Sequence, residues 1–253
     1  MCGIVGAISD KNVIPTLLDG LQRLEYRGYD SAGLAIREAS GELKRFRSLG
    51  KVSVLKDLIE RSAVHGTLGI AHTRWATHGK PAERTAHPHM SGVRVAVVHN
   101  GIIENHNKLR DQLLAAGFSF TSETDTEVVA HLLAHKLEAG MSLLQAVQEV
   151  RQEITGAYAL AAASPESPDC IIVTREGSPL VIGLGEGENF IASDVAALLQ
   201  VTQRFIFMEE GDIAEIRRDG ITIHDASGSE IQRQVQESRL SACSADKGAY
   251  RHY

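Results

Sequence analysis

Cysteine is scarce in this sequence, and its cysteines lie too far apart to pair in any recognisable spacing. The three are Cys2, Cys170 and Cys243, and no two of them form a CxxC motif. An odd number of widely separated cysteines argues against both a disulfide framework and a zinc ribbon. We expect Cys170, in the apolar run 169–173, to be a buried hydrophobic residue and Cys243 to be incidental.

Long apolar runs and an excess of positive charge are also lacking. No stretch approaches the roughly 18 residues of a transmembrane helix, and the first residues do not resemble a signal peptide. We therefore expect a cytoplasmic protein without a membrane partner. Acidic residues outnumber basic ones, 32 to 26, for a net charge of −6. That balance argues against a nucleic-acid partner.

Histidine is present, but not in a metal-binding pattern. His131 and His135 are four residues apart, yet Leu132 stands where the HExxH motif has glutamate. The segment 87–89 (His-Pro-His) lacks a carboxylate or cysteine at a supporting spacing. The glycines of 183–187 precede an apparent strand, whereas a dinucleotide-binding loop must precede a helix. We expect no metal and no cofactor.

Strands and helices are expected in consecutive runs rather than in strict alternation. Hydrophobic periodicity predicts strands at 2–8, 31–37, 42–49, 68–75, 93–99, 157–163, 170–174, 180–183, 189–192, 206–209, 213–217 and 221–225. It predicts helices at 13–24 (capped by Asn12, with Pro15 in the first turn), 52–61, 104–116, 126–139, 142–154 and 195–199. This order favours an α+β layered domain. The residues after about Ile231 are polar and are expected to form a tail.

A cysteine at the second position has one unusual property. Removal of Met1 would leave Cys2 with its own α-amine. Reference pKa values are about 8 for an α-amine and 8.5 for a thiol, so a neutral amine could accept the thiol proton. The alternative is that Cys2 only begins a buried strand, and position alone favours that alternative.

The Asn100-Gly101 pair follows the apolar strand expected at 93–99. An asparagine amide and an accessible glycine N–H are two donors that could form an oxyanion hole. The alternative is strong, because Asn-Gly is a common tight-turn dipeptide.

Two further segments offer charged groups. Arg74 ends a predicted strand, and its guanidinium could bind a carboxylate or belong to a structural ion pair. The neighbouring Trp75 could be a core or a functional residue. Thr124 and Glu127 fit a capping box, with Asp125 in the first helical turn, where it suits the helix dipole or could meet a ligand's ammonium group.

Five segments in one order carry a resemblance more specific than any single motif. They are 1–6 (MCGIVG), 27–33 (RGYDSAG), 72–79 (HTRWATHG), 99–101 (HNG) and 123–127 (ETDTE). The chain resembles the glutaminase domain of the class II glutamine amidotransferases, from Cys2 to Tyr253. Segments 24–31, 177–180 and 190–194 set it apart from the phosphoribosyl-pyrophosphate amidotransferases and asparagine synthetases of that class.

The resemblance implies an N-terminal-nucleophile hydrolase fold, a four-layer αββα sandwich of two antiparallel sheets between helices. It implies that Cys2 attacks the glutamine side-chain amide and that Asn100 and Gly101 form the oxyanion hole. Arg74 would bind the α-carboxylate of L-glutamine or L-glutamate, and Asp125 the α-ammonium group.

The remaining implied roles concern the pocket wall and the route of ammonia. Thr77 and His78 would shape the pocket, and Trp75 would gate the passage of ammonia. Arg27 and Tyr29 would lie near the side that faces further domains.

By the same resemblance, residues 2–240 form the glutaminase domain. Residues 241–253 would begin a linker to sugar isomerase domains, which are absent here, so we expect an excised domain. Three other hypotheses stay open at this stage. The first is an amidotransferase whose ammonia acceptor differs from the sugar phosphate of those isomerase domains, the second is a non-catalytic sensor of glutamine or glutamate, and the third is a metallohydrolase built on the histidines.

Overall fold

The computed structural model describes residues 2–75 and 81–238 of the chain. Its helices are α1 (Ile14–Leu24), α2 (Val52–Ser62), α3 (His106–Ala115), α4 (Asp125–Glu138) and α5 (Leu143–Glu153), with short 3-10 turns at Glu25–Arg27, Glu83–Thr85 and Val195–Ala197. Its strands are β1 (Gly3–Ser9), β2 (Ser31–Arg37), β3 (Leu43–Leu49), β4 (Leu68–Arg74), β5 (His89–Ser91), β6 (Val95–Ile103), β7 (Gly156–Ser164), β8 (Ser167–Glu176), β9 (Val181–Leu184), β10 (Glu188–Ala192), β11 (Arg204–Phe207), β12 (Ile213–Arg217), β13 (Ile221–His224), β14 (Glu230–Ile231) and β15 (Val235–Glu237).

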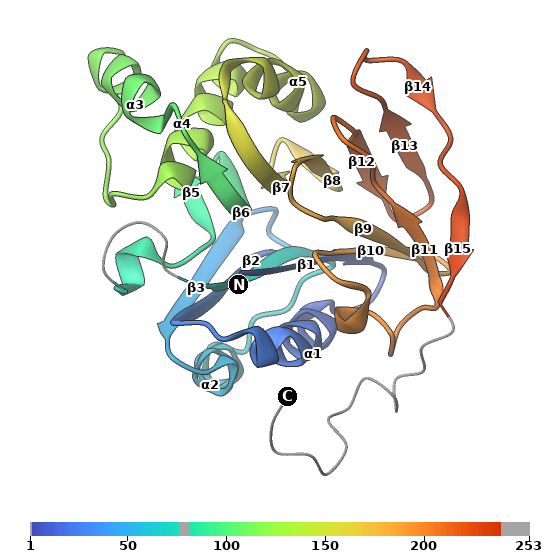
Figure 1. The fold of residues 1–253 in the computed structure, drawn as a ribbon. Coiled ribbons are helices and arrows are strands. Elements are labelled where there is room, and N and C mark those ends of the chain that lie inside the picture. Colours follow the sequence, from blue (N-terminus) through green and yellow to red (C-terminus); the bar gives the residue numbers. More distant parts are fainter. Residues whose placement is uncertain (1, 76–80, 239–253) are drawn as a thin grey trace.

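The strands form two antiparallel sheets that lie face to face (Figure 1). The first has the order β15-β11-β9-β10-β1-β4-β2-β3, and the second has the order β14-β13-β12-β8-β7-β6-β5. Strands β1 and β4 therefore lie inside the first sheet, and β6 and β7 lie inside the second. This arrangement confirms the predicted α+β class and the two antiparallel sheets.

Three apolar clusters define four layers. One cluster packs α1 and α2 against the outer face of the first sheet, and a second packs α3, α4 and α5 against the outer face of the other sheet. The third fills the space between the sheets with aliphatic side chains such as Ile4, Ile70, Val98 and Ile171. The helices thus cover the sandwich from both sides (Figure 1), as the predicted αββα order requires.

Helix α1 shows why the local sequence folds as it does. Leu17, Leu21 and Leu24 recur at helical spacing and are at most 1% exposed. Pro15 lies in the first turn, where its missing N–H costs no hydrogen bond. The predicted cap by Asn12 is wrong by one position: Val13 is the N-cap, and the Asn12 side chain instead accepts hydrogen bonds from the Ile14 and Gly66 N–H groups.

The strand predicted at 93–99 differs most from the observed one. β6 begins at Val95 and continues through Asn100 and Gly101 to Ile103, and it is paired with β7 from Ala96 to Ile103. The tight-turn interpretation of Asn100-Gly101 is therefore wrong. β5, which the periodicity did not predict, pairs with the start of β6.

The C-terminal prediction also needs correction within the described residues. Val235–Glu237 forms β15 at the edge of the first sheet, paired with β11, so the chain after Ile231 is not a tail up to this point. The helix predicted at 195–199 is only the 3-10 turn Val195–Ala197, and α3 begins two residues later than predicted. Residues 241–253 lie outside the described residues.

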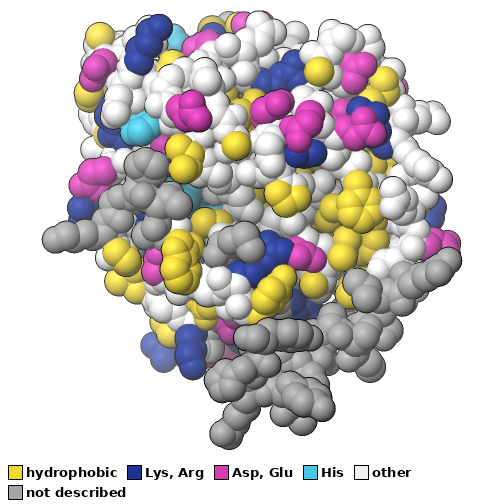
Figure 2. Space-filling model, viewed as in Figure 1, with side chains coloured by type: hydrophobic (Ala, Val, Ile, Leu, Met, Phe, Trp, Pro, Cys, Tyr) yellow, Lys and Arg dark blue, Asp and Glu magenta, His cyan; other side chains and the backbone are white. Residues whose placement is uncertain are grey.

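The surface mixes charges of both signs. On the face drawn in Figure 2, basic and acidic side chains lie interspersed among polar and apolar ones. Across residues 2–75 and 81–238, no helix is both long and apolar enough to cross a bilayer.

Candidate active site

Cys2 lies immediately before β1, at the edge of the inter-sheet layer. The ladder pairs Gly3 of β1 with Thr73 of β4, which brings Cys2 beside the end of β4. The Trp75 N–H donates to Cys2 Sγ at 3.2 Å, and Sγ lies 3.5 Å from the Trp75 carbonyl oxygen. The cysteine is half-buried.

Burial and hydrogen bonding act in opposite directions on this thiol. Burial raises the pKa of Cys2, and the Trp75 N–H and the Arg74 charge offset part of that rise. A thiol with a raised pKa is protonated at neutral pH and needs a base before it can attack a carbonyl group. Cys170, in contrast, is 4% exposed, and burial raises its pKa to about 11, as expected for an inert core cysteine.

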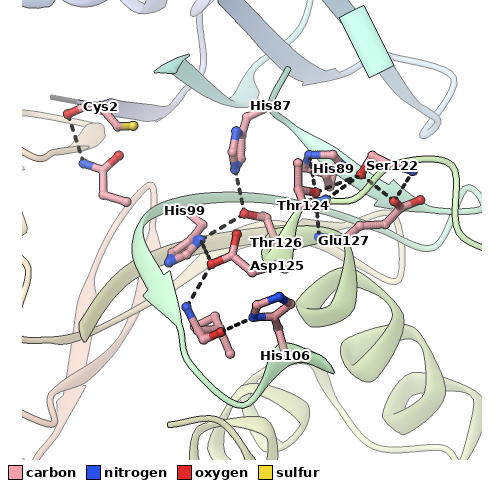
Figure 3. Close-up of polar contacts among 12 residues, drawn as sticks. Cys2, His87, His89, His99, His106, Ser122, Thr124, Asp125, Thr126 and Glu127 are labelled. Carbon is pink, nitrogen blue, oxygen red and sulfur yellow. Dashed lines mark hydrogen bonds and ion pairs between the residues drawn. The ribbon is translucent and has the colours of Figure 1, made fainter. Parts of the chain in front are cut away.

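Asn100 contacts Cys2 from the opposite sheet, and Gly101 follows Asn100 in β6. Asn100 Nδ2 donates to the Cys2 carbonyl oxygen at 3.3 Å (Figure 3). Gly101 has φ +123°, and a Cβ there would lie 2.0 Å from the Ala157 carbonyl oxygen of β7. Only glycine fits this position, because any side chain would collide with the neighbouring strand. The two sheets therefore bring the Asn100 amide to the backbone of Cys2.

Arg74 is the last residue of β4 and is 4% exposed. Its Nη1 lies 3.8 Å from Asp30 Oδ1 and donates to Thr85 Oγ1 at 3.3 Å. Arg74 therefore forms the structural ion pair that the sequence left open, with Asp30 as its partner. A guanidinium has five N–H donors, so this pairing is compatible with the binding of a carboxylate as well.

Trp75 is not a core residue, because its side chain is 53% exposed. Its ring lies over Gly28, where an added Cβ would come within 2.6 Å of it. Gly28 has φ +76°, so glycine is favoured there by both conformation and space. Thr77 and His78 lie outside the described residues.

Asp125 is the first residue of α4 and is 5% exposed. Its Oδ2 accepts the Ile103 N–H at 2.8 Å, at the end of β6. The predicted capping box is half right: Thr124 Oγ1 accepts the Glu127 N–H at 3.3 Å. The Glu127 carboxylate, however, binds the N–H groups of Thr121 and Ser122, each at 2.7 Å.

A network of buried histidines anchors the start of α4 to the sheets, and sequence reasoning gave these residues no such role. His87 Nε2 and His99 Nδ1 both bond Thr126 Oγ1, at 2.8 and 2.9 Å, and His89 Nε2 bonds Thr124 Oγ1 at 3.0 Å (Figure 3). The sequence offers such a signal only for His99, a histidine at the end of a predicted apolar strand, because His87 and His89 lie outside every predicted strand. Within the described ranges, no group of three or more His, Cys, Asp or Glu is placed to hold a metal ion.

Arg27 and Tyr29 lie between α1 and β2, and each has a partner nearby. Arg27 forms an ion pair with Asp194, and its guanidinium also lies over the Tyr26 ring. The Tyr29 hydroxyl bonds the Glu25 carboxylate, and its ring packs against the α1–α2 cluster. Burial, together with that carboxylate, raises the pKa of Tyr29 to about 12. Their predicted inter-domain role stays a prediction.

Comparisons with known proteins agree on one family. Residues 72–200 match the family model described as "Glutamine amidotransferase domain". Over all 253 residues, the chain is 56% identical to a glutamine–fructose-6-phosphate aminotransferase (isomerizing) of Pseudomonas aeruginosa and 57% identical to that of Escherichia coli K12. It covers 41% of each of those proteins, and so spans about two fifths of their length.

Solved structures show the same fold. The Bacillus subtilis glutamine phosphoribosylpyrophosphate amidotransferase, in complex with ADP and GMP, is 26% identical, with a TM-score of 0.76 over 90% of this chain and 50% of that one. A second structure, described as the allosteric regulatory enzyme of purine biosynthesis, is 27% identical and covers the same shares, with a TM-score of 0.77.

The buried histidines make stability depend on pH. Burial lowers the pKa of His72 to about 3 and lowers the pKa of His87 and His89 well below the ordinary 6.5. The folded protein therefore binds fewer protons, so their contribution is complete above pH 6.5 and is lost as pH falls below it. Well below pH 6.5, where the unfolded histidines are fully protonated, three such groups together give a slope of at most roughly 4 kcal/mol per pH unit. Urea unfolding at pH 7.5, 6.0 and 5.0 measures this slope.

A pair of variants assigns the slope to these residues. His89→Gln should reduce it by about one third, and His65→Gln, at an exposed histidine, should leave it unchanged. A free energy of unfolding that stays flat between pH 6.5 and 5 would mean that the folded protein accommodates charged imidazoles.

Proposed function

The chain belongs to the glutamine amidotransferase domain family, and from this premise we propose that it hydrolyses L-glutamine to L-glutamate and ammonia through a thioester on Cys2. The observation that carries the proposal is the meeting of Cys2 with Asn100 across two sheets, Asn100 Nδ2 being 3.3 Å from the Cys2 carbonyl oxygen. A substrate carbonyl group attacked by the Cys2 thiol would have the Asn100 amide and the N–H of the neighbouring Gly101 as the proposed donors to its oxygen.

The proposed reaction needs one base, which we assign to the α-amine of Cys2 after Met1 is removed. The amine takes the thiol proton, the thiolate attacks the amide carbon, and Asn100 with Gly101 stabilises the oxyanion. The C–N bond then breaks, and the protonated amine gives its proton to the leaving nitrogen, releasing ammonia. Water attacks the thioester, and glutamate leaves as the thiol is restored.

The two charged side chains would hold the amino-acid end of the substrate. Arg74 would bind the α-carboxylate and Asp125 the α-ammonium group, which are the two handles that every free amino acid carries. Their burial supports these roles, because a charge–charge contact is stronger away from water. Thr77, His78 and Trp75 complete the proposed pocket and ammonia gate.

The fate of the ammonia is a finer proposal. The names of the relatives point to amination of fructose-6-phosphate, and their greater length supports further sugar isomerase domains that would consume the ammonia. An amidotransferase with another acceptor is the alternative within the family. The domain bounds 2–240 and the cytoplasm as its compartment are proposals that rest on the sequence.

Substitution of Cys2 tests the nucleophile. Cys2→Ala should reduce glutamate release from glutamine to the limit of detection, because no other group forms the thioester. Cys170→Ala, at the buried cysteine, is the matched control and should keep wild-type turnover. Comparable turnover by Cys2→Ala would refute the assignment, and loss of activity with EDTA would favour a metal-dependent hydrolase. Glutamate binding without turnover in the wild type would favour a sensor.

Retention of Met1 tests the base. A preparation whose intact mass includes Met1 should have a kcat at least about 100-fold lower than the processed protein, because the α-amine then belongs to Met1 and not to Cys2. Glutamate release is measured on preparations with and without Met1, each verified by intact mass. Full activity in the uncleaved protein would exclude the α-amine as base.

Charge-conserving and charge-removing variants test the two handles. Arg74→Lys keeps the charge but loses the fork, and Asp125→Asn keeps an acceptor for the Ile103 N–H but loses the charge. Each should raise the KM for glutamine roughly 10- to 100-fold, the worth of one charged hydrogen bond. Arg94→Lys, in an exposed pair with Glu166, should leave KM unchanged. An unchanged KM in both pocket variants would contradict the proposed binding mode.

A further inference from the structure

His72 is fixed at the middle of the first sheet and reaches across to the second. Its backbone pairs with Ile4 of β1 on one side and with Gly33 of β2 on the other. Its side chain is 0% exposed. The ring contacts β6 through one nitrogen, Nε2, which lies 2.9 Å from the His99 carbonyl oxygen and 3.0 Å from Asn100 Oδ1.

The backbone carbonyl settles which nitrogen of His72 carries the proton. A carbonyl oxygen can only accept a hydrogen bond, so Nε2 must be the donor. Burial lowers the pKa of His72 to about 3, so the ring is neutral at physiological pH and has only this one N–H. Its Nδ1 is buried and has no hydrogen-bond partner among the described residues, so a proton on Nδ1 would lack an acceptor there.

The proton on His72 in turn fixes the orientation of the Asn100 amide. Nε2–H offers a hydrogen to the amide and therefore selects its oxygen, which leaves Nδ2 on the side of Cys2. There Nδ2 donates to the Cys2 carbonyl oxygen at 3.3 Å. A flipped amide would set two donors against each other at His72 and two acceptors against each other at Cys2.

We propose that His72 is a positioning residue for the glutaminase reaction: its Nε2–H locks the Asn100 amide with the NH₂ group toward Cys2. The inference rests on the proposed function, since it assigns the residue that aims the proposed oxyanion donor. An amide NH₂ has two hydrogens. One bonds the Cys2 carbonyl group, and the second is directed to the oxyanion that forms when the thiolate attacks.

The neighbouring ring supports this orientation. The His87 ring lies 4.1 Å from the His72 ring, centroid to centroid, with a tilt of 35°. His87 is itself held by Thr126 of α4. The imidazole that aims Asn100 is thus packed against one that is bonded to the helix carrying Asp125, so the donor and the proposed ammonium site share a rigid support.

Two substitutions separate the hydrogen bond from the volume of the ring. His72→Leu fills the space without a donor and should lower kcat for glutamine hydrolysis roughly 10- to 100-fold, with KM within about 3-fold, because a misdirected oxyanion donor affects the transition state more than the bound substrate. His72→Gln places an amide N–H near the former Nε2 and should recover most of kcat. His131→Leu, which removes a buried histidine bonded to Ser91, is the matched control and should keep kcat.

Ligand binding gives a readout that a merely structural role would not move. The aldehyde analogue of glutamine forms a hemithioacetal with Cys2, whose oxygen occupies the oxyanion hole, whereas L-glutamate makes no such contact. His72→Leu should weaken binding of the aldehyde at least about 10-fold and leave glutamate binding unchanged. Equal losses for both ligands, or a kcat equal to that of His131→Leu, would overturn the proposal.

The wild-type protein provides a test that does not depend on the folding of any variant. Nitrogen NMR of labelled histidine should show His72 as the neutral Nε2–H form from pH 8 down to pH 5. An Nδ1–H form or a charged ring in that range would overturn the proposal. If the tautomer is as stated but the wild type releases no glutamate from glutamine, the proposed function fails and not the geometry. An active wild type with the other tautomer leaves the function intact and removes His72 from it.

Discussion

Burial of imidazole rings where the two sheets meet the start of α4 is the constraint on which the rest of the structure depends. His72, His87 and His89 are at most 5% exposed, and a buried polar group without a partner is costly. Each ring is hydrogen-bonded through its Nε2, to the His99 carbonyl oxygen and the Asn100 amide or to a hydroxyl at the start of α4, whereas Nδ1 of His72 and of His87 has no partner among the described residues. The bonds from His72 to β6 link the two sheets, and those from His87 and His89 hold the start of α4. Apolar packing and the hydrogen bonding of buried polar groups therefore favour the same arrangement of sheets and helix.

The candidate site is a product of that arrangement. Cys2 and Arg74 come from the first sheet, Asn100 and Gly101 from the second, and Asp125 from α4. Only side chains on rigid elements hold such a constellation to within a fraction of an ångström, and here each residue lies on or directly beside a strand or helix. Burial serves the proposed chemistry as well, since it strengthens charge contacts, although it also raises the pKa of the thiol and so creates the need for a base.

Local signals in the sequence predicted the elements well where one face is regularly apolar. β2 and β12 have the predicted bounds, and α1, α4 and α5 agree to within a residue or two. The errors have tertiary causes. β6 runs on through Asn100-Gly101 because β7 pairs with it, against the local turn preference. β15 is polar and exposed, and it is a strand only because β11 offers it an edge.

By itself, the sequence determined the α+β class, through runs of periodic strands and helices, and the family, through five motifs in a fixed order. It also supplied the candidate site residues, because the sequence itself states which positions carry a thiol, an amide, a guanidinium or a carboxylate. The tertiary structure decided which of their atoms meet: that Trp75 is exposed, that Arg74 already has Asp30 beside it, and that the neutral ring of His72 orients Asn100. The physical reason is that periodicity reports which face is buried, whereas a tautomer or an amide orientation depends on contacts between residues distant in the chain.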